Sequence, residues 1–507
     1  MSDDFTQEEI AVLAPYVTNV DRQVYALKNL PEEVIAVLFA YYSRSRESLR
    51  RNLLRLIQEQ DIDLEARLRA SSLEETELAA AKGKAKQFHE KWVVGYGHAS
   101  VAEHAVVHLA IEDVSIIASK IIEDTRLASY TEKSTRYVLF DGERFVRVPR
   151  LMRSPHAGLY EDTVRDLLNA YVALVPQVVD RIKARIPRRP SQSDRAYDTA
   201  CRAKAYDLLR YLLPAATLTN LGLTINARAL EHLLTKLLSD PLEEVRHLGR
   251  AMKHEAEQVV PTLLKYSDYN AYMAETDQAM CQLSEELFAA GHPLETPAVS
   301  LVRFPVDAEE QLAAAIVYGY TGVSWLQVIE RVGKLSAEAR ARIIDEYLRR
   351  RGPHDQPLRA LEHLYYTFDI VLDYGAYRDI QRHRMATQTR QRLSTRYGYS
   401  VLDDVVAYGF GDTFQACMER AAHAYNRIVE DYPLDAQYVL PLAYRIRVLF
   451  TWNLRELFHF IQLRSAKQGH FSYRRIAQQV YGEIERVHPA LARYIRVDQS
   501  DYQLGRL

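Results

Sequence analysis

The chain of 507 residues contains only three cysteines, Cys201, Cys281 and Cys417. They stand far apart in the sequence and form no Cys-x-x-Cys pair, so the sequence disfavours both a zinc site and a disulfide framework. We therefore expect no metal centre and a protein of a reducing compartment, the cytoplasm.

Net charge is also nearly absent, with a formal value of −2. A balance this close to zero argues against bulk electrostatic binding of a nucleic acid polymer, so any anion site must be a local cluster of cations. No apolar run is long enough to span a bilayer, and the acidic start of the chain lacks a basic segment followed by an apolar one. We expect no membrane association.

The common catalytic motifs are missing as well. The sequence contains no P-loop, no Gly-x-Gly-x-x-Gly, no nucleophile elbow and no His-Glu-x-x-His. The motifs that usually hold nucleotide phosphates, a serine nucleophile or zinc therefore do not explain this chain.

What the sequence does contain is a basic triplet, Arg382-His383-Arg384. It directly follows a buried-looking stretch, and further arginines lie nearby at Arg378, Arg390, Arg392 and Arg396. A solvated basic helix end is the simplest interpretation of such a triplet. The surrounding arginines favour a second one, a site where guanidinium groups hold a phosphate or pyrophosphate through paired hydrogen bonds.

The two halves of the chain resemble each other. The tetrapeptide Ser-Thr-Arg-Tyr occurs at 134–137 and again at 394–397, and three more landmarks recur in the same order. These landmark pairs are Glu103-His104 with Glu362-His363, Leu213-Pro214 with Leu440-Pro441, and 226–232 with 453–459. We predict an internal duplication. Its repeats span residues 1–290 and 299–507, joined by a linker at 291–298 that is rich in glycine and proline.

Hydrophobic periodicity predicts a mainly helical protein with few strands. The predicted helices span residues 49–62, 160–185, 249–266, 337–351 and 414–432, and the predicted strands 104–114, 299–304 and 364–372. The predicted fold class is α+β, with two tandem domains, each mainly helical around a small antiparallel sheet.

Two polar segments can be interpreted either as ordinary structural elements or as parts of a binding site. The segment 453–464 can be an amphipathic helix that buries Leu454, Leu457, Phe458 and Ile461 and leaves its polar face in solvent. That face, with Asn453, Arg455, His459 and Arg464, also suits an anionic ligand that carries a ring. Likewise, each Ser-Thr-Arg-Tyr can cap a helix, or it can bind a phosphate through its serine and arginine.

These motifs resemble the flavin-dependent thymidylate synthases. Proteins of that family carry an Arg-His-Arg triplet, a Glu-x-Ser-x-Arg loop after it, a His-x-Ser before it, and a later Asn-x-Arg helix that ends in Leu-Arg. The resemblance implies conversion of dUMP to dTMP, with carbon from methylenetetrahydrofolate, reducing equivalents from NADPH and FAD as the hydride relay. It also implies homotetramers whose sites are shared between subunits.

By this resemblance the second half keeps the flavin-binding groups. They are Arg382, His383, Arg384, Asn453, Arg455 and His459. Arg464 takes the position of the arginine that polarises the uracil ring and is the expected catalytic residue, because a fixed cation stabilises negative charge on the pyrimidine.

The first half keeps complementary groups. Ser100 and Glu132 match flavin-contact positions, with His98 beside Ser100, and Ser134, Arg136 and Arg210 match nucleotide-binding positions. It has Asp124-Thr125-Arg126 in place of the triplet and Leu237 in place of the catalytic arginine, whereas the second half has Gln437 in place of Arg210. We therefore expect one composite site between the repeats, an inactive mirror-image site, and a homodimer that forms a pseudo-tetramer.

Some positions depart from the family pattern. Asp379 replaces the glutamine that pairs with the base, Thr131 replaces the loop asparagine, and Ser394 and Arg396 come two residues late. A carboxylate only accepts hydrogen bonds, whereas the glutamine also donates. Two alternatives therefore stay open: a related modification, such as hydroxymethylation, of another pyrimidine nucleotide, and a non-catalytic paralogue that binds flavin or nucleotide.

Overall fold

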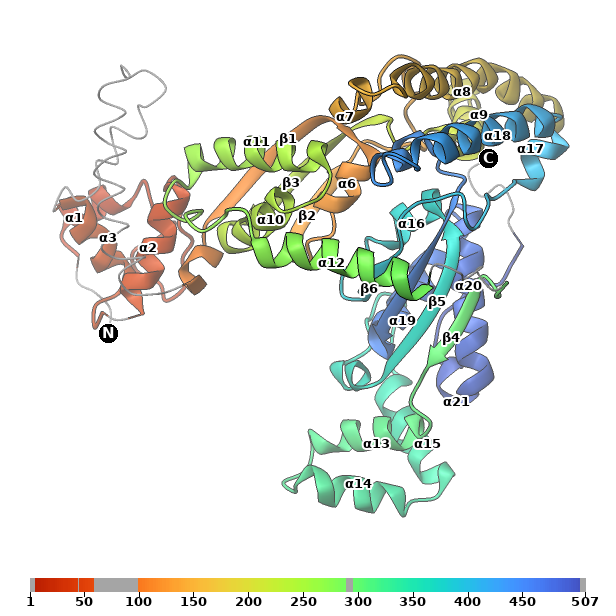
Figure 1. The fold of residues 1–507 in the computed structure, drawn as a ribbon. Coiled ribbons are helices and arrows are strands. Elements are labelled where there is room, and N and C mark those ends of the chain that lie inside the picture. The colour runs from red at the N-terminus through yellow and green to blue at the C-terminus, as the bar shows by residue number, and fades with distance from the viewer. Residues whose placement is uncertain (1–4, 44, 59–98, 289–294, 502–507) are drawn as a thin grey trace, which may run out of the picture. The chain divides into compact units, whose positions relative to one another are not determined.

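The computed structural model describes residues 5–43, 45–58, 99–288 and 295–501, which form two compact units (Figure 1). Unit 1 comprises residues 1–112, 127–132 and 220–289, and unit 2 comprises residues 113–126, 133–219 and 290–507. The middle of the first predicted repeat therefore packs in the same compact unit as the second repeat.

Unit 1 combines an N-terminal helical cluster with a small sheet. The buried side chains of three helices, α1 (Gln7–Leu13), α2 (Glu32–Tyr42) and α3 (Leu49–Gln58), contribute to one hydrophobic core. The sheet has the order β1–β3–β2, and β2 is antiparallel to β3. Its strands and the remaining elements are β1 (Val106–Ser115), β2 (Ala128–Glu132), β3 (Leu218–Asn226), η2 (Ala99–Glu103), α10 (Ala227–Leu238), α11 (Glu243–Val259) and α12 (Ala271–Phe288).

Unit 2 contains the larger sheet, with the order β4–β5–β7–β6 and antiparallel pairing throughout. The central pair runs in register from Tyr365 opposite Asn453 to Asp373 opposite Arg445. Along β7 every second residue is buried, as expected for a strand with one face on a core. The strands are β4 (Val299–Arg303), β5 (Tyr365–Asp373), β6 (Thr387–Arg390) and β7 (Arg445–Asn453).

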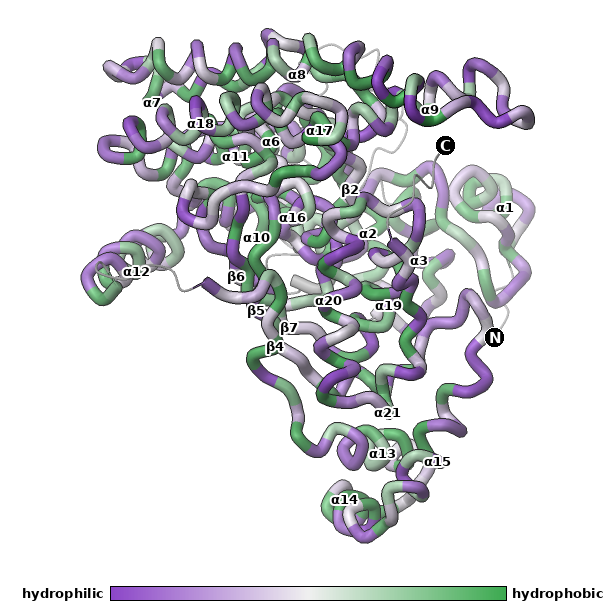
Figure 2. Tube along the Cα trace, turned by 90° about the vertical axis from the view of Figure 1, so that its right-hand side faces the viewer, coloured by the Kyte–Doolittle hydropathy of each residue, from purple (hydrophilic) through white to green (hydrophobic). Residues whose placement is uncertain are grey.

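Helices cover this sheet and extend from it. Figure 1 shows α19 and α20 beside the strands, and α20 packs on both β4 and α16. Hydrophobic and hydrophilic residues alternate along the long helix α8 in Figure 2, as its packing against α9 and α18 requires. The helices of unit 2 are α6 (Ile116–Ile122), α7 (Pro149–Met152), α8 (Ala157–Arg185), α9 (Asp194–Leu209), η3 (Arg210–Leu212), α13 (Ala308–Tyr318), α14 (Trp325–Gly333), α15 (Ala337–Leu348), η4 (Arg359–His363), α16 (Tyr374–Ile380), α17 (Asp403–Ala407), α18 (Gly411–Ile428), η5 (Asp435–Val439), α19 (Leu454–Ser465), α20 (Phe471–Val487) and α21 (Pro489–Ala492).

The predicted α+β class with two small antiparallel sheets is confirmed. All three predicted strands form, as β1, β4 and β5, but β3 and β7 were not predicted. The helix predicted to reach residue 266 is wrong at its end, since α11 stops at Val259. Pro261 explains this, because the residue before a proline avoids the helical conformation. The predicted helix at 49–62 forms up to Gln58, and its last four residues, like residues 291–294 of the predicted linker, lie outside the described residues.

Within unit 2 corresponding residues of the two halves make similar backbone contacts. The backbone N–H of Tyr374 donates to the carbonyl of Tyr444 at 2.9 Å, and that of Ile116 donates to the carbonyl of Thr217 at 3.2 Å. The two Leu-Pro landmarks also meet, with Pro214 bridged to Pro441. Tyr374 and Tyr444 of the second half correspond to Ile116 and Thr217 of the first, so these two hydrogen bonds are equivalent under the predicted sequence correspondence.

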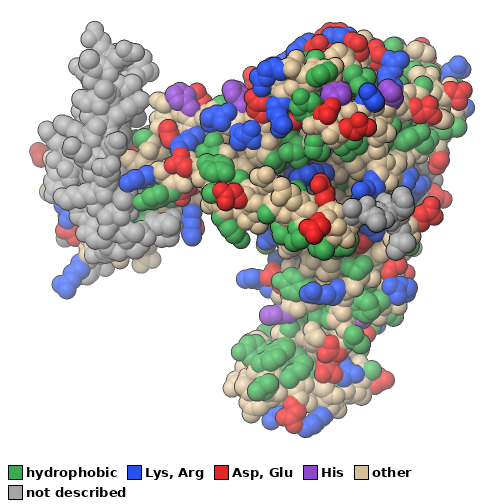
Figure 3. Space-filling model, viewed as in Figure 1, with side chains coloured by type: hydrophobic (Ala, Val, Ile, Leu, Met, Phe, Trp, Pro, Cys, Tyr) green, Lys and Arg blue, Asp and Glu red, His purple; other side chains and the backbone are tan. Residues whose placement is uncertain are grey.

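On the face seen in Figure 3, acidic and basic side chains intermingle over most elements. A group of hydrophobic side chains covers α13 and α14 at the bottom of this view, where Tyr318, Tyr320, Trp325 and Leu326 are exposed. In the described parts of the chain, no helix combines the length and the apolar character needed to cross a membrane.

Candidate functional site

The triplet lies in the turn between α16 and β6. Asp373 begins α16 by accepting a hydrogen bond from the backbone N–H of Ala376 at 2.6 Å. After the helix ends, the Nε2 amide of Gln388 donates to the carbonyls of Gln381 and His383 at 3.2 and 3.1 Å, which fixes the turn. In this turn His383 is buried, whereas Arg382 is exposed.

His383 is held between Arg464 and Glu456. The Nε–H of Arg464 donates to Nε2 of His383 at 2.9 Å, and Nδ1 of His383 lies 2.9 Å from Oε1 of Glu456. An arginine can only donate, so the histidine proton must be on Nδ1 and directed at Glu456. Burial, together with the charge of Arg464, lowers the pKa of His383 well below its usual value. The triplet therefore supplies two cations and one neutral imidazole.

Tyr473 on α20 joins the two predicted arginines of opposite repeats. The Arg464 guanidinium lies 5.3 Å from the centre of the Tyr473 ring, within the range of a cation–π contact. Arg136 donates from Nη1 to the hydroxyl of Tyr473 at 3.2 Å. Arg136 also donates two hydrogen bonds to the Asp207 carboxylate, from Nε to Oδ1 at 2.6 Å and from Nη2 to Oδ2 at 2.8 Å. Although burial opposes it, this pairing lowers the pKa of Asp207.

Arg210 meets Asp379 next to this cluster. Its Nη1 donates to Oδ2 of Asp379 at 3.2 Å, and its side chain is only 3% exposed. Burial alone would raise the pKa of Asp379, but the charges of Arg210 and Arg382 hold it below its usual value. The Nε and Nη2 atoms of Arg210 are buried and have no hydrogen-bond partner within the described chain. Buried donors of this kind are costly unless a ligand satisfies them.

Other predicted residues have structural partners. Asn453 caps α19 through the N–H of Glu456 at 2.9 Å, and Arg455 pairs with Glu362 at 3.0 Å. The ring of His459 lies 5.4 Å from that of His383, so it borders the triplet. The leucine, phenylalanine and isoleucine stripe predicted for α19 is buried.

Neither Ser-Thr-Arg-Tyr segment caps a helix, which corrects that interpretation. Both form turns in which the serine Oγ accepts from the arginine N–H two residues on, at 3.2 Å for Ser134 and 3.4 Å for Ser394. Glu132 lies in β2 and Ser100 in η2, both in unit 1. The Ser100 side chain and His98 lie outside the described residues.

Three partners of this cluster were missed from the sequence: Asp207, Tyr473 and Glu456. Asp207 precedes Arg210 by three residues, but nothing in that spacing identifies Arg136 as its partner. Glu456 follows Asn453 by three residues, the spacing of a helix cap and its partner, so their capping interaction could have been found from the sequence.

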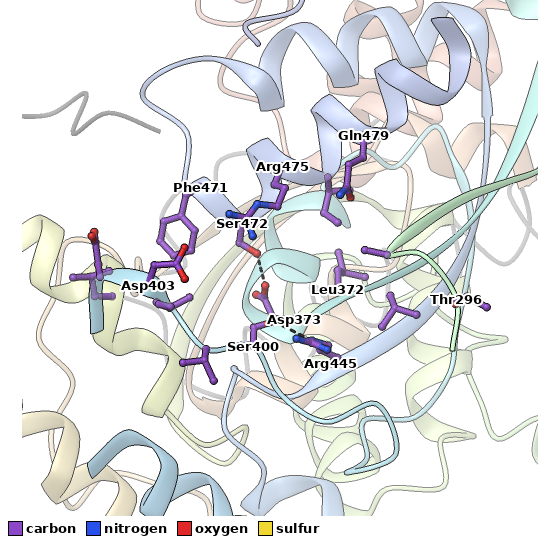
Figure 4. Close-up of a pocket in the computed structure, with 17 residues that line it drawn as sticks. Thr296, Leu372, Asp373, Ser400, Asp403, Arg445, Phe471, Ser472, Arg475 and Gln479 are labelled. Carbon is purple, nitrogen blue, oxygen red and sulfur yellow. Dashed lines mark hydrogen bonds between the residues drawn. The ribbon is translucent and has the colours of Figure 1, made fainter. Parts of the chain in front are cut away.

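A separate cavity of about 500 Å³ opens at the other end of α16, near Asp373 (Figure 4). Arg445 donates from Nε to the Ser400 hydroxyl at 3.2 Å, and Ser472 donates to the Asp373 carboxylate. None of the residues predicted to bind flavin or nucleotide lines it. Among the described residues, no group of three or more histidine, cysteine, aspartate or glutamate side chains could hold a metal ion.

Comparison with known proteins shows that one protein family matches both halves of the chain. A family model described as thymidylate synthase complementing protein matches residues 52–262 and 300–490, on either side of the predicted linker. The chain is 38% identical to a UPF0159 protein of Chlamydia muridarum, with 99% of this chain and 97% of that protein covered. It is 30% identical to a flavin-dependent thymidylate synthase of Geobacter sulfurreducens, with 37% of this chain and 81% of that protein covered.

A solved structure is also similar to part of the chain. It is a flavin-dependent thymidylate synthase of Helicobacter pylori complexed with FAD and dUMP. The similarity covers 38% of this chain and 97% of that chain, at 18% sequence identity and a TM-score of 0.30.

Proposed function

Because the chain belongs to the thymidylate synthase complementing protein family, in two tandem copies, we propose that it methylates dUMP to dTMP. The methyl carbon would come from methylenetetrahydrofolate and the reducing equivalents from NADPH. Bound FAD would supply the hydride relay. We further propose that the reaction takes place in the cytoplasm, at one composite site to which both repeats contribute, and that two chains form a homodimer with pseudo-tetrameric symmetry.

The observation that carries this proposal is the set of unpartnered donors on Arg210. A buried guanidinium whose Nε–H and Nη2–H groups have no partner among the described residues is preorganised for an anion with several acceptor oxygens, such as a nucleotide phosphate. Arg464 and Arg136 meet at the ring of Tyr473, and Arg382 lies close enough for its charge to lower the pKa of Asp379.

We propose that the reacting pyrimidine base lies next to Arg464. Its guanidinium is fixed by His383 and by the Tyr473 ring, so its charge does not need to reorganise when negative charge develops on the pyrimidine. The exposed Arg382 and the imidazole of His459 at the rim supply a cation and a flat surface, which fit the pyrophosphate and ring system of FAD.

Asp379 supports a second candidate, modification of another pyrimidine nucleotide. Its carboxyl is kept ionised by the neighbouring arginines, so it accepts hydrogen bonds and donates none. A base with an exocyclic amino group would match it better than uracil, which presents carbonyl oxygens beside its single N–H.

The test begins with purified protein, its flavin absorbance, and dTMP formation from dUMP, methylenetetrahydrofolate and NADPH. Arg464→Ala and Arg210→Ala should each abolish product formation. Gln437→Ala should retain it, because the Gln437 side chain bonds to the backbone of Leu393 and Leu434, at 3.3 and 2.8 Å. Bound flavin without dTMP would favour the second candidate, and equal damage from Gln437→Ala would contradict the composite site.

A further inference from the structure

The segment that replaces the triplet in the first repeat lies directly against the triplet of the second. Gln381, the residue before Arg382, donates from Nε2 to the carbonyl of Lys120 at 2.8 Å and to Oδ1 of Asp124 at 3.0 Å. Gln381 is buried, so these hydrogen bonds are shielded from water. The first repeat thus fixes the start of the triplet turn.

The end of the turn is held by Arg126. Its Nη2 donates to the carbonyl of Ala386 at 3.1 Å and to Oγ1 of Thr387 at 3.3 Å. In the opposite direction, Nη1 of Arg384 donates to the carbonyl of Thr125 at 3.3 Å. Arg126 and Arg384 are the last residues of corresponding segments, and each donates to a backbone carbonyl of the other repeat.

Asp124 completes the contact. Its Oδ1 lies 3.5 Å from Nη1 of Arg390, the last residue of β6, and the same nitrogen donates to the hydroxyl of Tyr377 at 3.4 Å. A carboxylate at this position repels phosphate, but it suits a contact in which Gln381 and Arg390 both present donors. The chemistry of the segment therefore fits a structural partner of the triplet better than a second anion site.

We propose that residues 120–126 act as a brace that positions the triplet of the second repeat for flavin binding. This inference rests on the proposed function, because that function assigns the triplet to FAD. Arg126 and Asp124 are positioning residues: they hold the turn through its two ends and its neighbouring strand. The two copies of the segment then have different roles: residues 382–384 bind flavin, and residues 120–126 support them.

The first test uses the protein without added flavin. The amides of His383 and Ala386 are hydrogen-bonded within the turn, to the carbonyls of Ile380 at 3.0 Å and His383 at 3.3 Å. In hydrogen–deuterium exchange, Arg126→Ala should speed exchange of the peptide that spans these amides by roughly tenfold, since the turn opens more often. Arg126→Lys should restore part of the protection, because lysine still donates to a carbonyl.

The second test is an FAD titration followed by absorbance and fluorescence. Arg126→Ala should weaken FAD binding roughly tenfold, as expected when a supporting hydrogen-bonded group is removed. Arg486→Ala is the matched control, because Arg486 pairs with Glu483 of the same helix and its side chain is 59% exposed. It should change neither the exchange nor the affinity.

The outcomes separate this inference from the proposed function. If Arg126→Ala leaves both the exchange rate and the FAD affinity at wild-type values, residues 120–126 do not position the triplet, whether or not the protein forms dTMP. If Arg126→Ala lowers only the unfolding midpoint, its role is structural and the brace is again wrong. If wild-type protein binds no FAD, the proposed function fails, and faster turn exchange in Arg126→Ala still identifies residues 120–126 as the support of the triplet.

Discussion

The Nε–H of Arg464 donates to Nε2 of His383, with 2.9 Å between the two nitrogens. The contact requires a neutral imidazole, and burial supplies it by lowering the pKa of His383. The middle residue of the triplet is therefore the hydrogen-bond acceptor that orients the expected catalytic arginine, and Glu456 fixes the tautomer that makes this possible.

Glu456 provides the first prediction. Glu456→Leu leaves the Nδ1–H of His383 without an acceptor, so the ring and Arg464 lose their fixed orientation. We expect kcat to fall roughly 10–100-fold, as for other misplaced catalytic groups. Glu456→Gln keeps an acceptor oxygen and should retain most of the activity. The measurement is steady-state dTMP formation, and equal rates in both variants would contradict the orienting role.

Arg136 and Arg210 should differ in what they contribute, which is the second prediction. The donors of Arg136 are occupied by Asp207 and Tyr473, whereas two donors of Arg210 have no partner within the described chain. Arg210→Met should therefore weaken dUMP binding more. Arg136→Met leaves Asp207 buried and unpaired, so it should lower the free energy of unfolding by about 3–5 kcal/mol.

Calorimetric titration of dUMP and urea unfolding measure the two effects separately. Asp207→Asn with Arg136→Met serves as the control, because the double variant removes both charges and should recover part of the lost stability. A larger loss of dUMP affinity in Arg136→Met than in Arg210→Met would contradict this division.

The sequence predicted the local features of the fold well. The buried stripe of α19 follows from the spacing of neighbouring residues, and the structure contains it. The strands β3 and β7 were missed because their alternating pattern is set by pairing with distant strands rather than by local signals. Their flanking landmarks were recognised only as repeats.

For the candidate site, sequence identified most arginines but not their partners. Arg136 and Asp207 are separated by 71 residues, and Arg136 and Tyr473 by 337. No periodicity links positions so far apart. The resemblance also does not foresee that His383 is neutral, since that depends on burial and on the charge of Arg464.

His470 provides the third prediction, on pH. It is buried beside Tyr211 and Phe471, its Nδ1 accepts from the N–H of Ser472, and its Nε2 lies 3.1 Å from the carbonyl of Asp207. Burial, with the nearby charge of Arg210, lowers its pKa to about 3. The folded protein therefore keeps His470 neutral at pH values where the unfolded chain protonates it.

The sign follows from this difference. Between the unfolded pKa of about 6.5 and the folded value, the unfolded state binds the extra proton, so stability falls as the pH falls. From pH 7 to pH 5, His470 should contribute about 2 kcal/mol to the loss of unfolding free energy. His470→Gln should lose that much less over the same range, measured by urea unfolding at both pH values. An equal loss in both proteins would refute the assignment to His470.

The fourth prediction concerns Gly469, at the turn before α20. A Cβ there would lie 2.8 Å from Cε2 of Tyr473 and 2.9 Å from the carbonyl of Ala466. Gly469→Ala must therefore displace the ring on which Arg464 rests, and we expect a loss of about 1–3 kcal/mol in unfolding free energy together with a lower kcat.

Gly482, in the middle of α20, is the matched control for Gly469. Its Cβ would meet no atom within 4 Å, and the residue is exposed. Gly482→Ala should therefore stabilise the protein by about 0.5–1 kcal/mol, because alanine restricts the unfolded chain and favours the helix. Urea unfolding of both variants gives opposite signs if the close packing at Gly469 holds Tyr473 in place. Stabilisation by both variants would show that the Tyr473 ring is free to move away from Gly469.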